Sequence, residues 1–339
     1  MAPPAVRAQR RMHQDRAFTF YQAARAILHR LNPRTALRCG QQKDRKIIKF
    51  SGIANVPGRV AFYASSEHFR QDIPALVPRK CHDYLVAQNF MHEEFMQEGR
   101  PKVYFSREPR VCLSPETREN LSRKDAARFV VSFAEEDIDR RMFYVALPGR
   151  KGRLIKRLTR SLSHQRARLC CIINRYAEND QLALLQERVR FVKAMGADID
   201  IFGHAPWSGA NKWTGYPGYR GAARDKMRTL TQYNFNLCFE NCDEDGYITE
   251  KIIQALMAGC VPLYWGGGSY LEQTIPAACF INCRDQDPVE IYQRIRTMSR
   301  DQIVEYRRAG LDFISSPQAD RFTWGHWAQL LLRRLEAQS

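Results

Sequence analysis

The sequence contains no long hydrophobic run. No stretch of the 339 residues approaches the roughly 18 apolar residues that a membrane-spanning helix requires. The first 30 residues also lack the apolar core of a secretory signal peptide. We therefore expect a polypeptide that is soluble or bound only to the surface of a membrane.

Several motifs of ligand-binding proteins are absent as well. No G-x-G-x-x-G turn follows an early strand, which argues against a pyridine-nucleotide dehydrogenase. The ten cysteines do not form the usual zinc pairs, although Cys238 lies near Cys242 and Cys279 lies near Cys283. Without an export signal, reduced thiols are the expected state. We predict neither a bound metal nor a structural disulfide.

Positive charge is concentrated in two segments. The chain carries a net charge of +17, of which residues 1–50 contribute +10 and residues 150–168 contribute +8. Nucleic-acid binding is the first interpretation of such basicity, but no zinc-finger, recognition-helix or aromatic RNA-binding motif accompanies it, so we expect no nucleic-acid partner. The patch at residues 150–168 would raise the local concentration of an anionic substrate.

The N-terminal basic segment has the pattern of an amphipathic helix over residues 15–31. Apolar residues recur there at helical spacing, with arginines close by. Such a helix either docks on an anionic membrane surface or packs its apolar stripe against the domain and leaves the charges in solvent. Both interpretations remain open.

The most informative segment is residues 234–268, which reads as strand, loop, helix and strand. Residues 235–240 are largely apolar, as in a strand buried within a parallel sheet. After a turn, apolar residues recur at helical spacing, which predicts a helix that begins near Gly246 or Tyr247. This helix ends at Gly259, a residue suited to the left-handed C-terminal cap.

Lys251 occupies an unfavourable position in that helix. Its charge lies in the first two turns, near the free N–H groups and the positive end of the helix dipole. This placement is unfavourable unless a polyanion such as a pyrophosphate binds there. The alternative is a lysine that points into solvent, at a cost of about a few tenths of a kcal/mol. The ligand interpretation is favoured by the polar residues that gather where open α/β sheets bind ligands: Asn241, Tyr247, Thr249 and Glu250.

This block resembles the α-1,3/1,4-fucosyltransferases. The resemblance runs from Phe239 to Gly266 and comprises Phe-Glu-Asn, Tyr-Ile-Thr-Glu-Lys, Ala-Gly-Cys-Val-Pro-Leu and a glycine-containing turn. It implies an α/β fold of GT-B architecture, with two Rossmann-like domains facing a central cleft. It also implies inverting transfer of L-fucose from GDP-β-L-fucose to a hydroxyl of an N-acetylglucosamine-containing glycan, with an α-1,3 or α-1,4 linkage. Because no membrane anchor is seen, the chain is similar either to bacterial members, which are cytoplasmic or peripheral, or to a truncated Golgi member from which the anchor has been removed.

The alternation of elements agrees with two domains. We place an acceptor-binding domain at residues 1–158 and a donor-binding domain with a C-terminal packing helix at residues 159–339, since a linker-like stretch lies at residues 148–153. The strands expected in the second domain are 168–174, 198–203, 234–240, 261–266 and 279–283.

The resemblance implies that Arg188 grips the donor phosphates. The sequence predicts a strand at residues 170–174 and, after it, a helix from Arg188 to Met195, so Arg188 lies at the start of this helix. Its planar guanidinium can hold two phosphate oxygens at once. Arg190 points to a different side of the helix and is the weaker candidate. The alternative is a surface arginine on an amphipathic helix. Lys226 is a further candidate for contact with the donor.

Inverting transfer requires a base that takes the proton from the acceptor hydroxyl. The resemblance assigns this role to Glu108, which follows a strand expected at residues 102–106. Without the resemblance, a single glutamate in a loop reads as solvated surface. Glu135 and Glu136 begin an acidic stretch that either lines the acceptor side or forms a charged turn.

No metal or cofactor is expected at the site. Asp198-Ile-Asp200 has the spelling of the Asp-x-Asp motif that holds Mg²⁺ or Mn²⁺ in many sugar transferases, but it reads as a sheet strand. Cations and helix N–H groups would instead stabilise the departing diphosphate, at about 1.5–3 kcal/mol for each charge-assisted hydrogen bond. The alternatives are a transferase for another GDP-sugar, a protein O-fucosyltransferase, or a non-catalytic nucleotide- or nucleic-acid-binding module.

Overall fold

The structure is a computed structural model of the whole chain, and its description is limited to part of the residues. These are 60–63, 84–88, 102–105, 108–113, 115, 118–119, 129–131, 133–176, 184–203, 211–323, 326–327 and 330. The helix predicted at residues 15–31 lies outside them. The chain divides into two compact units, Met1–Met142 with Trp324–Ser339, and Phe143–Thr323. This division lies upstream of the predicted boundary at residue 158, and the C-terminal residues group with the first unit.

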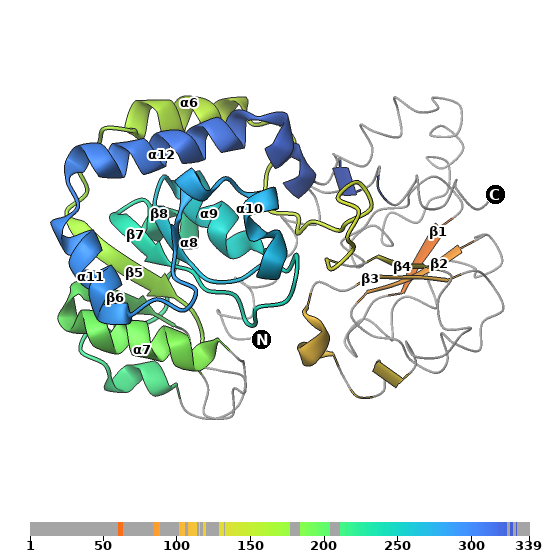
Figure 1. Cartoon of the computed structure of the whole chain (residues 1–339), viewed down its shortest axis with the longest axis horizontal. Helices are drawn as coiled ribbons and strands as arrows, with labels where there is room; N and C mark the ends of the chain where they lie inside the picture. The colour runs from red at the N-terminus through yellow and green to blue at the C-terminus, as the bar shows by residue number, and fades with distance from the viewer. Residues whose placement is uncertain are drawn as a thin grey trace, which may run out of the picture. The chain divides into compact units, whose positions relative to one another are not determined.

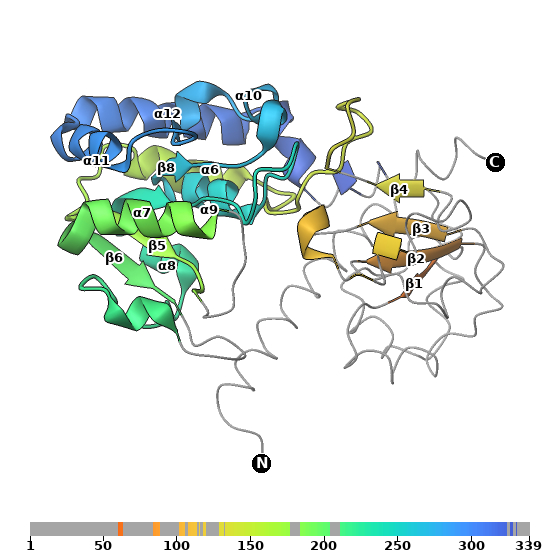
Figure 2. The same cartoon turned by 60° about the horizontal axis from the view of Figure 1, so that its bottom comes forward.

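The first unit contains a parallel four-stranded sheet in which spatial order follows chain order. The strand predicted at residues 102–106 is present as β3, and the short helix η3 (Arg110–Cys112) follows it. Figure 2 shows the four strands side by side. They are β1 (Val60–Tyr63), β2 (Tyr84–Gln88), β3 (Lys102–Phe105) and β4 (Phe129–Val131).

The second unit contains a parallel five-stranded sheet with the order β6-β5-β7-β8-β9. Every residue of β8 is buried, which explains why this inner strand has no charged or strongly polar side chain. All five predicted strands are present with slightly shorter bounds: β5 (Arg168–Ile173), β6 (Ile199–Phe202), β7 (Tyr233–Leu237), β8 (Val261–Tyr264) and β9 (Ile281–Asn282).

Helices cover both faces of this second sheet (Figure 1). Helix α12 packs with α6 and α9, whereas α7 packs with α11. The longer helices are α6 (Gly152–Ser161), α7 (Leu185–Met195), α9 (Glu250–Ala258), α11 (Pro288–Thr297) and α12 (Arg300–Ser315). The shorter ones are η4 (Gly196–Asp198), η5 (Lys212–Gly215), α8 (Lys226–Leu230), η6 (Gly268–Tyr270), α10 (Leu271–Thr274), η7 (Ala277–Cys279) and η8 (Pro317–Phe322).

Helix α9 begins later than predicted. The apolar pattern places its start near Gly246 or Tyr247, but the helix begins at Glu250, with Thr249 as its N-cap. The reason is that the preceding residues form a turn, in which Gly246 has a φ of +71°, outside the helical region. The predicted end is confirmed, since Gly259 adopts the left-handed conformation with a φ of +68°.

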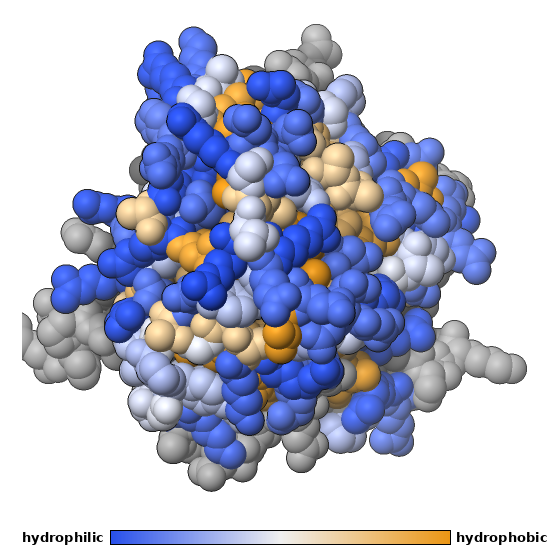
Figure 3. Space-filling view, turned by 60° about the vertical axis from the view of Figure 1, so that its left-hand side comes forward, coloured by the Kyte–Doolittle hydropathy of each residue, from blue (hydrophilic) through white to orange (hydrophobic). Residues whose placement is uncertain are grey.

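The surface of the second unit is mainly hydrophilic on the face shown in Figure 3, where hydrophobic side chains lie scattered between polar ones. Among the residues that the structure describes, no helix combines the length and the apolar character needed to cross a bilayer.

Candidate functional site

The centre of the site is Glu240, a carboxylate with no exposed surface, three residues after the end of β7. It accepts hydrogen bonds from the backbone N–H of Thr249 (2.8 Å), the hydroxyl of Tyr264 (3.0 Å) and Nζ of Lys251 (2.6 Å). The Thr249 hydroxyl also lies 2.8 Å and 2.9 Å from the two carboxylate oxygens. A buried carboxylate is costly unless it is paired and hydrogen-bonded, so these donors act together to stabilise Glu240 at the start of α9.

Lys251 is the second residue of α9, so its charge lies at the positive end of the helix dipole, where the Thr249 side chain caps the Lys251 backbone N–H. Its unfavourable position is compensated within the protein, because Glu240 provides the opposite charge. The side chain of Lys251 retains 16 % exposure. The ammonium has two partners within the protein, Glu240 and the Thr249 hydroxyl at 3.2 Å.

Arg188 meets the same residue from another element. Its side chain lies on α7 and is 1 % exposed. Nη2 donates to the main-chain carbonyls of Phe239 (2.8 Å) and Glu240 (2.5 Å) and to Oδ1 of Asn241 (3.2 Å). The structure thus brings Arg188 and Lys251 together: Arg188 binds the main chain of Glu240, and Lys251 binds its side chain.

Arg190, the weaker candidate, lies apart from this cluster. Its side chain is 57 % exposed and pairs with Glu187, three residues before it, at 2.8 Å. A pair of this kind on an exposed helix face contributes only a few tenths of a kcal/mol, about 0.3–0.5.

Lys226 joins the cluster from the start of α8, which packs against α9. Burial lowers the pKa of Lys226 most; the positive charge of Lys251 lowers it further, whereas Glu250 and Glu240 raise it. Each of these side chains is therefore within electrostatic reach of Lys226. Three cations, counting Arg188, gather with two carboxylates at the amino end of α9.

The loop between β7 and α9 holds the remaining predicted donor contacts. Asn241 accepts from Arg188 through its side chain and from the backbone N–H of Leu184 through its carbonyl, at 3.2 Å. Tyr247 is 2 % exposed, and its backbone N–H donates to the carbonyl of Glu244 at 3.0 Å. Hydrogen bonds within the protein thus hold these residues in a folded loop.

The predicted base lies in the first unit. Glu108 is exposed and occupies the loop between β3 and η3, where Pro109 after it is buried. The predicted acceptor-side residues Glu135 and Glu136 form an ordered turn, because the 1 % exposed Arg141 donates to their carbonyls through Nε (2.7 Å) and Nη2 (3.1 Å). Their main chain is fixed by Arg141, while the Glu136 side chain is exposed.

The Asp-x-Asp sequence is engaged by protein side chains. Asp198 accepts from the hydroxyl of Tyr292 at 2.5 Å. Burial alone would raise the pKa of Asp200, but hydrogen bonds from its partners lower it. These partners are Tyr233 at 2.7 Å, Arg220 at 2.6 Å and Arg168 at 2.5 Å. Across the described ranges, no group of three or more His, Cys, Asp or Glu side chains is placed to hold a metal ion.

Two side chains of the site, Glu240 and Tyr264, are missing from the residues predicted from sequence. A usable signal was present for Glu240, because it is the one charged residue at the end of an apolar strand. The loop after β6 is rich in aromatic residues. Trp213 is fully buried and packs edge-on against Tyr176 and Tyr216, so its ring belongs to the core. Residues 204–210 of that loop lie outside the described residues.

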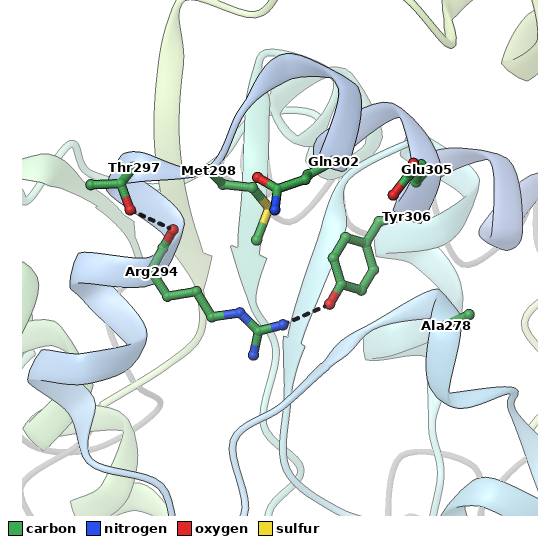
Figure 4. Close-up of a pocket in the computed structure, with 7 residues that line it drawn as sticks. All are labelled: Ala278, Arg294, Thr297, Met298, Gln302, Glu305 and Tyr306. Atoms are coloured by element: carbon green, nitrogen blue, oxygen red, sulfur yellow. Dashed lines mark hydrogen bonds between the residues drawn. The ribbon is translucent and has the colours of Figure 1, made fainter.

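A pocket of about 560 Å³ lies elsewhere, between η7, α11 and α12 (Figure 4). Arg294 and Tyr306 point toward one another there, and Nη2 of Arg294 donates to the Tyr306 hydroxyl at 2.9 Å. Its lining residues are Ala278, Arg294, Thr297, Met298, Gln302, Glu305 and Tyr306. None of them is a residue of the Glu240 cluster, so this pocket is separate from the candidate site.

Comparisons with known proteins agree on one family. Residues 163–308 match the family model described as glycosyltransferase family 10 (fucosyltransferase) C-term. A 62-residue segment is 45 % identical to alpha-(1,3)-fucosyltransferase FucT of Helicobacter pylori, and covers 18 % of this chain and 13 % of that protein. A 77-residue segment is 38 % identical to GDP-fucose protein O-fucosyltransferase 3 of Bos taurus, and covers 22 % of this chain and 16 % of that protein. The matches thus span less than a fifth of either relative.

A solved structure has a similar fold. The UDP-forming alpha,alpha-trehalose-phosphate synthase of Burkholderia xenovorans superposes with a TM-score of 0.51 at 11 % identity, over 79 % of this chain and 76 % of that one. This likeness concerns the fold alone. With a parallel sheet in each unit, it confirms the predicted class, α/β with GT-B architecture.

Proposed function

We propose that the protein transfers L-fucose from GDP-β-L-fucose to a glycan, because residues 163–308 match the family model of the glycosyltransferase family 10 (fucosyltransferase) C-term. The acceptor is a hydroxyl of an N-acetylglucosamine-containing glycan, and the product carries an α-1,3 or α-1,4 linkage. One observation supports the donor site above all: Arg188 and Lys251 converge on Glu240 at the amino end of α9.

The donor diphosphate binds at this amino end in the proposal. The positive end of the α9 dipole and the Lys251 side chain, which is 16 % exposed, face it, and the partly desolvated Lys226 adds a second ammonium. Arg188 already binds three acceptors of the β7–α9 loop, so it holds the loop in place and contributes its charge to the site. The cluster thus supplies positive charge where the leaving group becomes negative.

Transfer proceeds by direct displacement with inversion. Glu108 takes the proton from the acceptor hydroxyl while that oxygen attacks the anomeric carbon and the bond from this carbon to the GDP oxygen breaks. The cations of the donor site stabilise the departing GDP, so no metal is required in this proposal. Glu135 and Glu136 are proposed to lie on the acceptor side.

Two related activities use the same donor site. A protein acceptor is a specific alternative, because one of the relatives is a GDP-fucose protein O-fucosyltransferase. Another GDP-sugar as donor is the second alternative.

The proposal also concerns the location of the protein. We propose a cytoplasmic protein of bacterial type that attaches peripherally to an anionic membrane through its basic N-terminal segment.

The test is a transfer assay with the full chain. GDP-fucose and competing GDP-sugars are offered with N-acetyllactosamine, chitobiose, lipid-linked and peptide acceptors, with and without EDTA. Mass spectrometry detects the product, and NMR determines its anomeric configuration and linkage. We expect α-linked fucose on an N-acetylglucosamine-containing acceptor in both conditions. Transfer only to a peptide would favour the protein O-fucosyltransferase, and loss of turnover with EDTA would contradict the metal-free mechanism.

A further inference from the structure

One carboxylate, that of Asp243, joins the ends of three neighbouring strands. Asp243 follows β7; it accepts from the backbone N–H of Gly268 (2.9 Å) and from Nε1 of Trp265 (3.1 Å), which both follow β8. Arg284, which follows β9, binds it in a bidentate manner, with Nη2 at 2.7 Å from Oδ1 and Nη1 at 2.6 Å from Oδ2. Two parallel N–H···O bonds fix the relative orientation of the two groups as well as their distance.

The β8–η6 turn interlocks with the loop that Asp243 belongs to. Asp245 in that loop accepts from the backbone N–H of Ser269 (2.6 Å) and from its hydroxyl (2.9 Å). Residues 266–268 are all glycines with positive φ, and a Cβ on each would press against a different residue of the loop region. The three close approaches are Gly266 to Glu240, Gly267 to Ile248 and Gly268 to Asp245.

Arg284 binds both the loop that contains Asp243 and the turn that follows β8. Besides Asp243, its Nη2 also binds the carbonyl of Gly268 at 3.0 Å. The ion pair is partly exposed, with 32 % of the Arg284 side chain and 22 % of the Asp243 side chain accessible, so its contribution to global stability is small. Its geometric effect is larger, because it holds the loop of residues 241–249, which carries Asn241, Tyr247 and Thr249 and leads into α9.

We propose that Arg284 is a positioning residue for donor binding, acting through Asp243 on the loop of residues 241–249. This inference rests on the proposed donor site. Arg284 belongs to a strand end outside the cation cluster, and it acts by keeping the loop in the conformation that presents the amino end of α9. Without the bidentate pair the loop is less ordered in the free protein. Donor binding must then also supply the free energy that orders the loop, and the affinity falls.

The test measures GDP binding to the full chain by calorimetry. Arg284→Ala and Asp243→Asn are each expected to weaken GDP binding about tenfold. Because the two substitutions remove the same contact, the double variant is expected to bind GDP no more weakly than the weaker-binding of the two single variants. Arg284→Lys keeps the charge but not the fork and is expected to recover only part of the affinity. In the transfer assay, the KM for the donor rises with little change in kcat.

Arg220→Ala is the matched control, since it removes another partly exposed ion pair of similar length, with Asp200 at 2.6 Å. It is expected to leave GDP binding unchanged. Wild-type affinity in Arg284→Ala, or an equal loss in Arg220→Ala, would overturn the proposal. Failure of the wild-type protein itself to bind GDP would instead contradict the donor site.

A second readout requires no ligand. Hydrogen exchange followed by mass spectrometry should show faster exchange for peptides covering residues 241–249 and 265–270 in Arg284→Ala, but unchanged exchange in α12. Arg220→Ala should leave both loop peptides at wild-type rates. Unchanged exchange of the loop peptides in Arg284→Ala would overturn the positioning role, even if the proposed transfer activity is present.

Discussion

Lys251 and Glu240 form an ion pair at 2.6 Å in which the carboxylate is completely buried and the lysine side chain stays 16 % exposed. Glu240, shortly after β7, provides the negative charge, and the start of α9 places the positive charge of Lys251 at the positive end of the helix dipole. The ion pair with Glu240 thus compensates for a lysine that is unfavourable at the start of an isolated helix. It holds the positive charge where we propose that the diphosphate binds.

Removing Lys251 should destabilise the fold as well as the donor complex. In Lys251→Met, Glu240 loses its opposite charge but stays buried, and we expect the free energy of unfolding to fall by about 3 kcal/mol. The double variant Lys251→Met with Glu240→Gln should recover most of this loss, because a neutral amide needs no counter-charge. Urea denaturation of the wild type, the single variants Lys251→Met and Glu240→Gln, and the double variant measures the coupling. Additive losses would contradict the pairing.

Glu108 should affect chemistry and not donor binding. A glutamine cannot take a proton, so Glu108→Gln is expected to lower kcat by about 10²–10⁴ while the Kd for GDP stays unchanged. Glu119→Gln, another exposed glutamate of the first unit, is the control and should keep full activity. Stopped-time transfer assays and calorimetry measure the two quantities. Intact activity in Glu108→Gln would favour a non-catalytic nucleotide-binding module.

Lys226 should make donor binding depend on pH in the alkaline range. Its pKa is lowered from 10.5, first by burial, so the ammonium loses its charge at a lower pH than a lysine in water. The positive charge attracts the diphosphate only below that pKa, and the Kd for GDP should therefore rise as pH increases through it. Lys226→Arg remains charged and should show a weaker dependence; comparison of the two proteins cancels the titration of GDP itself. Identical pH profiles would exclude this role.

The sheet of the second unit could be predicted from sequence because its strands are short apolar runs between turn residues. β5, β7 and β8 are buried on both faces, and Gly259 marks the end of α9 by its left-handed conformation. The start of α9 could not be located from the apolar pattern. Ile248 continues the helical spacing although it belongs to the turn before the helix, where Gly246 keeps a positive φ.

The partners of the site residues were harder to predict, because they meet only after strands pair. Glu240 binds Tyr264, 24 residues later in the chain, because β7 lies beside β8. Asp243 binds Arg284, 41 residues later, because β9 lies next to β8. Arg188 was identified through the family resemblance, but its three acceptors in the β7–α9 loop depend on tertiary packing that no local pattern reports.

The most direct test of the donor site is a calorimetric titration of GDP-fucose, in EDTA, into the wild-type protein and Lys251→Met, with Arg190→Ala as a control for removal of a nearby cation outside the cluster. The account predicts that the wild type and Arg190→Ala bind equally and that Lys251→Met binds about a hundredfold more weakly. Equal binding by Lys251→Met, or no binding by the wild type without a metal ion, would contradict it.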